Sequence, residues 1–404
     1  MYGLTLLSLS LATIMDQVLA RPTSCGMGAT QNKNGKAIYL ITNDNTNAVV
    51  SIPIGEDGLL QTTGTSTATA GAGSNSFDGL TNQTAAPDAL FSQSSLTIAG
   101  NNLFAVNAGC NSLSMFAIDP QDPTKLTMVG KPVAVPGEFP TTVAASAEHQ
   151  IACVGSTGAK AGVSCASFSA KGLGAMDDLR EFDLGQTTPP VGPMNTVSQV
   201  AFSNDGKTLF TTVKGDPTKN NTGFLASFHV QACTKTKAVS VSQKAVMSSP
   251  AGTAVLFGFS TMKGSNNLFV TDASFGGAVL SFDQGILATV QGKEVVYGQT
   301  ATCWVAISPA TNTAFVTDVG VNRMVEMSLT DASIQGQVDL SANGDPGLID
   351  LRAAGDFVYA LSPGNGTTQA AVTVVNAMTK EQVQHFQLQD LGVGKNAQGM
   401  ALLE

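Results

Sequence analysis

Residues 203–228 read SNDGKTLFTTVKGDPTKNNTGFLASF. Leu209, Thr211 and Val213 alternate with other residues directly after an Asn-Asp-Gly turn that ends at Gly206, and this pattern is typical of a β-hairpin. A polar loop then leads into another apolar segment that ends in Ser-Phe. The stretch therefore predicts consecutive antiparallel strands joined by short turns.

The central motif of this stretch, an apolar segment followed by small or polar residues, occurs seven times along the chain. The copies are AIYLITND from Ala37, NLFAVNAG from Asn102, IACVGSTG from Ile151, TLFTTVKG from Thr208, NLFVTDAS from Asn267, TAFVTDVG from Thr313 and FVYALSPG from Phe357. Their spacing of roughly 45–65 residues is the range of four-stranded propeller blades. Because one pair of strands cannot bury its apolar face alone, the copies must stack on one another.

A further strand leads into most copies, as in TTVAASAEH from Thr141 and CWVAISPAT from Cys303. The copy at Ala37 has no such lead-in, whereas AQGMALLE from Ala397 looks like a lead-in with nothing after it. In a ring, the last strand would join the blade that begins at Ala37, and closure would remove the exposed sheet edges. An open β-solenoid or two sandwiches would not account for both observations. The sequence thus predicts an all-β, seven-bladed β-propeller closed by the C-terminal strand, with residues 21–404 as a single domain.

Composition limits the classes of partner. The 404 residues carry a net charge of −9, only 12% of them are charged, and no basic stripe is visible. Binding to nucleic acid or to an anionic membrane is therefore not expected. Outside the N-terminus no run approaches the roughly 18 apolar residues that a membrane span needs.

The N-terminus predicts secretion. Residues 1–20 resemble a signal peptide, with an apolar core at Leu4–Leu11 and a cleavage-like Val-Leu-Ala that ends at Ala20. No basic residue precedes that core, and a disordered N-terminal arm is the alternative. Three sequons in polar loops would become glycan sites in a secreted chain; they begin at Asn82, Asn220 and Asn365.

Six cysteines fit an oxidising compartment. Cys153 and Cys165 lie on consecutive predicted strands of one blade, and we expect them to form a disulfide. The pairing of the other four stays open; these are Cys25, Cys110, Cys233 and Cys303. The small-residue stretch 62–77, TTGTSTATAGAGSNSF, is expected to be a flexible surface loop over one end of the ring.

A propeller gathers the beginnings of its inner strands around a central channel, so candidate site residues are sought there. The predicted catalytic residues are Glu138, Asn195, Lys214 and Gln398. The predicted substrate-binding residues are Asp88, Phe139, Met194, Phe257, Trp304, Arg323 and Asp345. For each of them a turn-forming or otherwise satisfied structural role is the alternative.

Several of these residues have a specific expected role. Glu138 stands in Pro-Gly-Glu-Phe-Pro, where burial would raise its pKa and suit it to proton transfer. Trp304, the only tryptophan, would either stack on a ligand or pack between blades. Lys214 and Arg323 could polarise a carbonyl oxygen. The three histidines occupy unlike repeat positions, so neither a metal cluster nor a His-paired nucleophile is expected. We assign no cofactor and no metal ligand; Ca²⁺ held by a ring of Asp, Asn and Glu oxygens in the channel is the alternative.

Four segments of the chain resemble a known group of proteins. They are AGAGSNS from Ala70, PDALFSQSSLTIAGNNLFAVNAGCNSLSMFAIDPQDPTKLTMVGKP from Pro87, PGEFPTTVAAS from Pro136 and ACVGSTGAKAGVSC from Ala152. These segments look like the fungal secreted lactonase-like propellers, which are also called 3-carboxymuconate cyclase-like proteins. The resemblance implies a secreted propeller and chemistry that forms or opens a lactone. A looser similarity connects the chain to hetero-Diels–Alderases that join a tropolone-derived quinone methide to a humulene-type sesquiterpene without a cofactor.

Three functions from different classes follow. The first is cofactor-free, hetero-Diels–Alder-type cyclisation of a hydrophobic small molecule, because positioning two apolar partners can contribute roughly 7–11 kcal/mol and hydrogen-bond donors add further stabilisation. The second is a lactone hydrolase or muconate-type cycloisomerase, although a tricarboxylate needs several cations and the chain has only four arginines. The third is a non-enzymatic cell-wall glycoprotein. We rank the cyclase first because of the looser resemblance to the hetero-Diels–Alderases and because nucleophile, metal and nucleotide motifs are all missing. The oligomeric state stays open.

Overall fold

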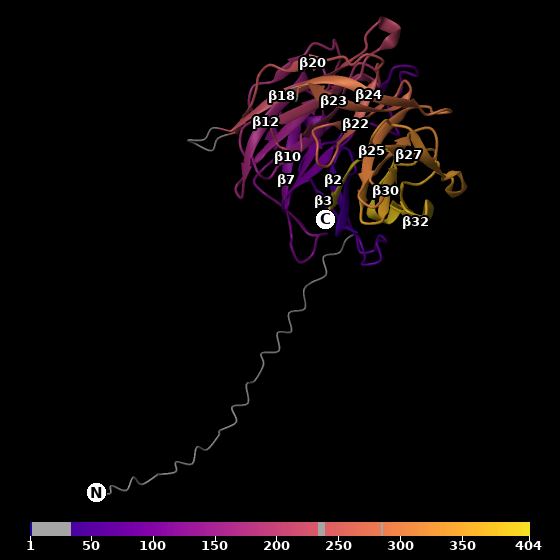
Figure 1. The fold of residues 1–404 in the computed structure, drawn as a ribbon. Helices are drawn as coiled ribbons and strands as arrows, with labels where there is room; N and C mark the ends of the chain where they lie inside the picture. Colours follow the sequence, from indigo (N-terminus) through magenta and orange to yellow (C-terminus); the bar gives the residue numbers. More distant parts are fainter. Residues whose placement is uncertain (2–33, 233–238, 284–285) are drawn as a thin grey trace. The chain divides into compact units, whose positions relative to one another are not determined.

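The computed structural model describes residues 1, 34–232, 239–283 and 286–404. Within these residues the strands form seven antiparallel sheets, the blades, each with a path of four strands (Figure 1). Three blades carry one additional short strand, and a separate parallel pair joins two connections between blades.

The blades are numbered in chain order. Blade 1 consists of β1 (Ala37–Ile41), β2 (Ala48–Pro53), β3 (Thr65–Ala68) and β33 (Gln398–Leu403). Blade 2 consists of β5 (Leu96–Ala99), β6 (Asn102–Asn107), β7 (Ser112–Ile118), β8 (Leu126–Met128) and β9 (Val133–Ala134). Blade 3 consists of β10 (Pro140–Ser146), β11 (Ile151–Ser156), β12 (Ala161–Ser169), β13 (Gly172–Leu173) and β14 (Arg180–Phe182). Blade 4 consists of β16 (Val197–Phe202), β17 (Thr208–Val213), β18 (Phe224–Ala232), β19 (Val239–Val241) and β20 (Val246–Ser248).

The remaining blades are more regular. Blade 5 consists of β21 (Leu256–Thr261), β22 (Leu268–Asp272), β23 (Gly276–Asp283) and β24 (Leu287–Val295). Blade 6 consists of β25 (Thr302–Ser308), β26 (Thr313–Asp318), β27 (Arg323–Ser328) and β28 (Ile334–Asp339). Blade 7 consists of β29 (Leu351–Ala354), β30 (Phe357–Ser362), β31 (Ala371–Asn376) and β32 (Glu381–Gln387). The short 3₁₀ helices are η1 (Ala108–Cys110), η2 (Pro217–Lys219), η3 (Ser341–Asn343) and η4 (Gln389–Leu391).

The C-terminal strand closes the ring. β33 runs antiparallel to β1, with Ala37 opposite Leu403 and Tyr39 opposite Ala401. The innermost strands contact one another in the cyclic order β5, β10, β16, β21, β25, β29, β33 and again β5. The predicted seven-bladed propeller, closed by its last strand, is therefore confirmed.

The inner two strands of each blade lie between neighbouring sheets, which explains their continuous apolar runs. All six residues of β17 are buried, and the predicted turn before it is present, with Gly206 at φ +66°. Aromatic rings fill the gaps between blades. Phe104 of blade 2 packs on Phe168 of blade 3 with their ring centroids 4.8 Å apart. Close packing between sheets thus favours strands that are apolar on both faces.

The prediction of a loop at residues 62–77 is wrong for residues 65–68. Thr65–Ala68 forms β3, the outer strand of blade 1, in register with Ala48–Ser51. Thr and Ser suit an exposed edge strand, so the small-residue composition did not prevent pairing. Farther along, β4 (Phe77–Asp78) pairs in parallel with β15 (Val191–Gly192) and joins two long connections between blades.

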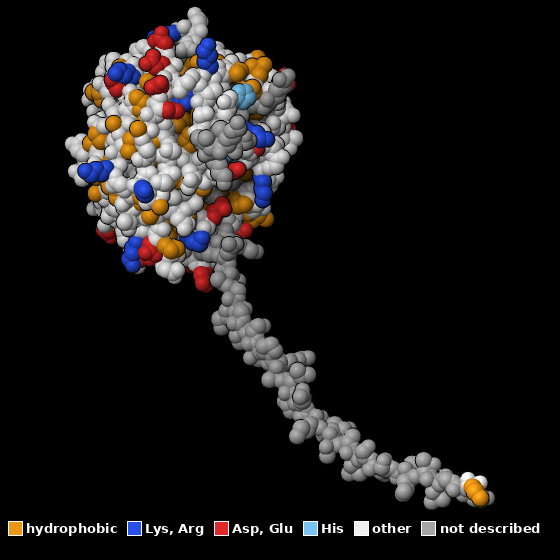
Figure 2. Space-filling model, turned by 90° about the vertical axis from the view of Figure 1, so that its left-hand side faces the viewer, with side chains coloured by type: hydrophobic (Ala, Val, Ile, Leu, Met, Phe, Trp, Pro, Cys, Tyr) orange, Lys and Arg blue, Asp and Glu red, His pale blue; other side chains and the backbone are white. Residues whose placement is uncertain are grey.

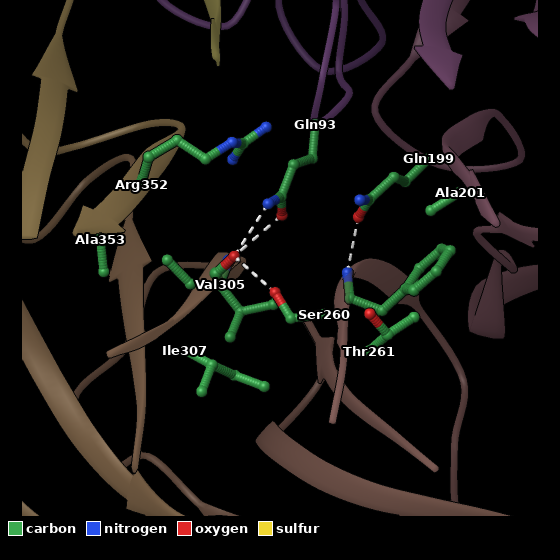
Figure 3. A pocket seen from close by; sticks show the side chains of 11 residues that line it. Gln93, Gln199, Ala201, Ser260, Thr261, Val305, Ile307, Arg352 and Ala353 are labelled. Atoms are coloured by element: carbon green, nitrogen blue, oxygen red, sulfur yellow. Dashed lines mark hydrogen bonds between the residues drawn. The ribbon is translucent and has the colours of Figure 1, made fainter. Parts of the chain in front are cut away.

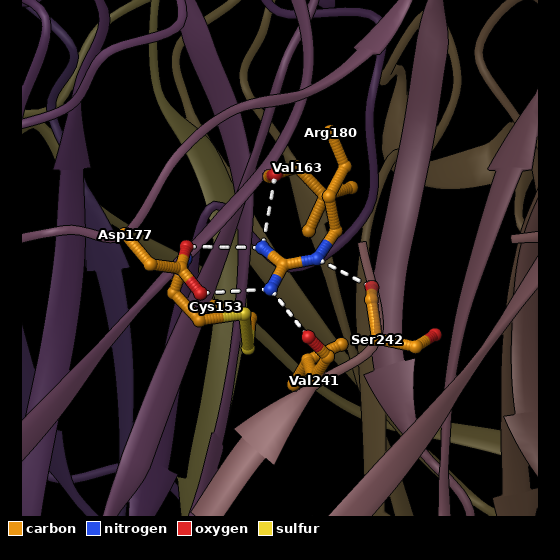
Figure 4. Close-up of a disulfide and its surroundings, with 7 residues drawn as sticks. Cys153, Val163, Asp177, Arg180, Val241 and Ser242 are labelled. Atoms are coloured by element: carbon orange, nitrogen blue, oxygen red, sulfur yellow. Dashed lines mark hydrogen bonds and ion pairs between the residues drawn. A yellow bond between two sulfur atoms is a disulfide. The ribbon is translucent and has the colours of Figure 1, made fainter. Parts of the chain in front are cut away.

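The predicted disulfide between Cys153 and Cys165 is confirmed; these residues lie opposite each other on β11 and β12 (Figure 4). Beside it, the buried Arg180 forms a bidentate ion pair with Asp177, with N···O distances of 3.0 and 2.7 Å. Its Nε also donates to the Ser242 carbonyl oxygen at 2.8 Å. The arginine therefore joins blade 3 to the segment that follows β19 in blade 4.

The predicted signal peptide, residues 1–20, lies outside the described residues except for Met1, as do Cys25 and Cys233. No helix in the described part of the chain has the length and apolarity of a membrane span. Asn82, Asn220 and Asn365 are all exposed, as glycosylation would require. Figure 2 shows acidic and basic side chains dispersed over one face of the molecule. The disulfide is compatible with secretion, which stays a prediction.

Candidate functional site

The centre of the ring is crossed by residues 91–95, which we call the crosspiece. Phe91 and Ser94 adopt left-handed backbone conformations, with φ of +51° and +64°, and the whole segment is buried. Its backbone bonds to inner strands on several sides: the Gln93 amide donates to the Ser198 carbonyl at 2.9 Å, and the Val143 amide donates to the Ser94 carbonyl at 2.9 Å. An irregular buried segment needs such partners for its peptide groups. The axial channel expected from the sequence is therefore occupied by the chain itself.

One carboxylate links the crosspiece to β33, the strand that closes the ring. Asp350 lies immediately before β29 and is fully buried. Its Oδ2 accepts hydrogen bonds from the amides of Ser94 at 2.9 Å and Met400 at 3.0 Å. Its Oδ1 accepts from Nη1 of Arg352 at 2.6 Å. Asp350 thus holds the crosspiece, β33 and blade 7 together.

Four of the predicted site residues meet beside the crosspiece. The Lys214 Nζ donates to the carbonyl oxygen of Phe91 at 2.6 Å and lies 4.2 Å from the centroid of the Phe257 ring. The Phe257 and Trp304 rings meet edge to face, with centroids 4.9 Å apart. The Trp304 indole donates to the Ser92 carbonyl at 3.0 Å. Together with Asp88, these side chains form what we call the hub cluster.

The two charged members of the hub cluster have strongly displaced pKa values. Burial raises the pKa of Asp88 to about 7, against the lowering effects of the Lys214 charge and of the Phe91 and Ser92 backbone amides. Burial lowers the pKa of Lys214 to about 8, against the raising effect of Asp88. The Oδ1 atom of Asp88 is buried without a hydrogen-bond partner. Two groups that titrate near neutrality are candidates for proton transfer at physiological pH.

A pocket lies on the side of the hub where the inner strands begin; we call it the upper pocket. Its volume is about 450 Å³, within the usual range for small-molecule sites. Asp88 does not itself line the pocket; it directly follows the lining residues Ala86 and Pro87 in the chain and is 5% exposed. The lining residues are Asp78, Thr81, Gln83, Thr84, Ala85, Ala86, Pro87, Phe91 and Val319.

A second pocket of about 330 Å³, the lower pocket, lies across the crosspiece, where the inner strands end (Figure 3). Figure 3 shows Gln93 in the middle, with Arg352 and Gln199 on either side of it. None of these three residues is among the candidates predicted from the sequence. The pocket is lined by Gln93, Gln199, Ala201, Phe259, Ser260, Thr261, Val305, Ala306, Ile307, Arg352 and Ala353.

Three predicted residues lie in the loops before inner strands rather than in the hub cluster. Glu138 is only half-buried, and its Oε2 accepts a hydrogen bond from the Thr188 hydroxyl at 2.6 Å. The expected enclosing apolar frame is therefore incomplete. Asn195 donates to the Leu184 carbonyl, and Met194 is 38% exposed.

The other four predicted residues have separate surroundings. Phe139 is buried in the core cluster that includes residues of blades 2 and 3. Gln398 is fully buried at the beginning of β33, and neither of its amide atoms has a partner. Arg323 donates to the Tyr297 carbonyl at 2.8 Å from the third strand of blade 6. Asp345 lies 3.0 Å from Nε2 of a histidine on β32, so its partner belongs to the outer strand of blade 7.

Asp88 was selected as a residue near the beginning of an inner strand, but β5, the innermost strand of blade 2, begins at Leu96. The crosspiece occupies the residues between. Two glycines could have signalled it, because a Cβ at Gly258 would collide with the Gln93 side chain and one at Gly399 with the Ser95 hydroxyl. Among the described residues, no group of three or more His, Cys, Asp or Glu side chains could hold a metal ion.

Comparisons with known proteins agree on the fold. No protein-family model matches the chain, and no curated protein matches it significantly. A periplasmic gluconolactonase from Pseudomonas aeruginosa superposes with a TM-score of 0.63 at 14% identity, covering 91% of this chain and 99% of that one. A putative 6-phosphogluconolactonase from Bacteroides fragilis gives a TM-score of 0.61 at 13% identity, covering 92% and 99%. At these identities the likeness shows a lactonase-like propeller fold and nothing finer.

Proposed function

We propose that this protein hydrolyses small lactones at the upper pocket, with Asp88 as the general base. The observation that carries the proposal is the buried Asp88–Lys214 pair, whose pKa values are displaced toward neutrality from opposite sides. The likeness to a gluconolactonase and to putative 6-phosphogluconolactonases supports the choice of lactones.

In this mechanism a lactone binds in the upper pocket with one water molecule between its carbonyl carbon and Asp88. The ionised carboxylate removes a proton from the water as the water oxygen attacks that carbon. The ring C–O bond then breaks, and the proton passes to the departing ring oxygen. The product is an open-chain hydroxy acid. Lys214 does not touch the substrate; its charge favours ionisation of Asp88.

The Diels–Alder-type cyclisation that we ranked first from the sequence is less well supported. It requires an apolar hollow large enough for two partners, and three of the four apolar residues expected to line one are packed against protein, whereas Met194 is 38% exposed. Phe139, Phe257 and Trp304 are each at most 1% exposed. The gluconolactonase and the putative 6-phosphogluconolactonases described above do not favour this reaction. The lactone hydrolase, which was the alternative, therefore becomes the proposal.

The test is hydrolysis of glucono-δ-lactone and γ-butyrolactone by the purified chain, followed as acid release in a pH-stat. After subtraction of the buffer blank, the enzyme-catalysed rate of Asp88→Asn should be about a hundredfold lower than that of the wild type. The reason is that general base catalysis typically contributes 10²–10⁴-fold. Glu326→Gln is the matched control. Glu326 is also a buried carboxylate with a cationic partner, Lys380 at 2.6 Å, but it lies on β27, away from the hub cluster.

A rate equal to the buffer blank for the wild-type chain would remove the hydrolase proposal and favour the non-enzymatic glycoprotein. Equal rates for wild type and Asp88→Asn would leave the hydrolase standing but overturn the role of Asp88. A loss of activity in Glu326→Gln as large as in Asp88→Asn would attribute the effect to general destabilisation.

A further inference from the structure

The lower pocket brings side-chain N–H donors together beside two hydroxyl groups, those of Ser260 and Thr261. The Gln93 Oε1 already accepts from the Val305 amide at 3.2 Å, while its Nε2 donates to the Val305 carbonyl at 2.9 Å. The Gln199 Oε1 accepts from the Phe259 amide at 2.6 Å (Figure 3). Each side-chain oxygen thus already accepts one hydrogen bond, and N–H groups of both amides remain to donate. These amides are 1% and 5% exposed, so their positions are fixed by the fold.

Arg352 adds a cation to this donor set. Its Nη1 is engaged by Asp350 and by the Leu351 carbonyl, and its Nη2 donates to the Ser94 hydroxyl at 2.8 Å. A guanidinium has five N–H groups, so Nε and one proton of Nη2 remain available. The side chain is 23% exposed, and it lines the pocket. Its contacts with the buried Asp350 and the crosspiece hold it in place.

The remaining walls are mainly apolar and come from three blades. Ala201 belongs to blade 4, Phe259 to blade 5 and Ile307 to blade 6. A ligand that fits both parts needs an acceptor-rich, anionic end and a short apolar body. Asp350 balances the charge of Arg352, the one cation among the described residues that line the pocket, so an anion would be held by the remaining N–H groups and not by net charge. A monoanion therefore suits the site better than a dianion such as phosphate.

We propose that the lower pocket is a binding site for small aliphatic monocarboxylates, with the carboxylate held by Arg352, Gln93 and Gln199. A guanidinium and a carboxylate form charge-assisted bonds that are stronger than neutral ones. The apolar walls would bury the carbon chain. This site is separated from the upper pocket by the crosspiece and does not depend on the proposed lactone hydrolysis.

The test is isothermal titration of the full chain with hexanoate and, as a neutral isostere, hexanamide. Hexanoate should bind saturably and hexanamide roughly tenfold or more weakly, because a charge-assisted bond is replaced by a neutral one. Arg352→Lys keeps the charge opposite Asp350 but removes the planar fork, and it should weaken hexanoate binding about tenfold.

Ala353→Glu provides a second variant that leaves Arg352 and Asp350 unchanged. The new carboxylate would lie in the pocket wall and compete for the same donors, so hexanoate binding should disappear while the melting temperature and any lactone hydrolysis are retained. The proposal is overturned if hexanoate does not bind saturably to the wild type, if hexanamide binds as well as hexanoate, or if Ala353→Glu binds hexanoate like the wild type.

Discussion

Lys214 and Asp88 show at the residue scale how desolvation dominates the centre of this ring. Each is a charged side chain that is almost never found fully buried without a partner. Lys214 obtains partners from the Phe91 carbonyl and the Ser198 hydroxyl, whereas one oxygen of Asp88 obtains none. A buried, incompletely satisfied carboxylate costs stability, and we interpret that cost as a sign of function.

The pKa of Asp88 leads to a pH dependence of stability. Its folded pKa of about 7 lies above the unfolded value of about 3.9, so the native state binds more protons between these two pH values. Stability should therefore fall as pH rises from about 4 to about 7, by up to about 1.4 kcal/mol per pH unit from this group. Denaturant titrations of wild type and Asp88→Asn across this range measure the difference.

In Asp88→Asn the contribution of this group should be absent, so the variant should gain stability relative to wild type as the pH approaches 7. Lys214 affects the stability over a different pH range. Its lowered pKa means that the unfolded chain binds more protons above about pH 8, so its contribution to stability should increase there. A constant difference between Asp88→Asn and wild type from pH 4 to 7 would show that the carboxyl has an ordinary pKa.

At the scale of elements, the sequence predicted strands well and the crosspiece not at all. The repeated motif and the segment before it predict strands, because the alternation of apolar and polar residues and the turn residues are local signals in the sequence. The same logic placed Cys153 opposite Cys165. Residues 91–95 belong to no repeat and have no periodicity, and their position depends on contacts with strands far away in the sequence. The role of Arg323 stays a prediction; the residue begins β27, the third strand of blade 6, and not an inner strand.

Gly258 on β21 tests the packing of the crosspiece. A Cβ at this position would lie too close to the Gln93 side chain and also 2.7 Å from the Cys303 carbonyl oxygen. Gly258→Ala should therefore lower the free energy of unfolding by about 1–3 kcal/mol, the usual cost of overpacking. Denaturant unfolding at a fixed pH measures it.

Gly394 is the matched control for this substitution. A Cβ there would meet no atom within 4 Å. Gly394→Ala should be neutral or stabilise the chain by about 0.4–1 kcal/mol through the unfolded state. If both alanine variants had the same stability as wild type, the crosspiece would not pass beside β21 as described.

For the whole molecule, the ring depends on one antiparallel pairing between its ends. Removing residues 398–404 would leave the buried β1 without an inner neighbour and would remove the Met400 amide from Asp350. We expect this truncated chain to lose cooperative unfolding and to become sensitive to limited proteolysis. Deletion of Glu404 alone is the control and should have little effect, because that residue is exposed and lies beyond the strand. Cooperative unfolding of the longer truncation would contradict closure by the last strand.

The whole molecule is a closed ring with a filled axis and with two pockets on opposite sides of the crosspiece. Composition and repeats predicted the ring. They placed Asp88 and Lys214 among the candidates but could not predict their unusual pKa values, which these residues acquire only from burial. The lower pocket could not be predicted either, because Gln93, Gln199 and Arg352 come together from segments that are far apart in the sequence.

The pH–rate profile of lactone hydrolysis tests the central claim most directly. With Asp88 as base and Lys214 as its charged neighbour, the enzyme-catalysed rate should rise as pH increases through about 7 and fall as it increases through about 8. The Asp88→Asn variant should lack the rising limb and the Glu326→Gln variant should retain it. A rate above the blank that rises steadily with pH and is unaffected by Asp88→Asn would contradict the account.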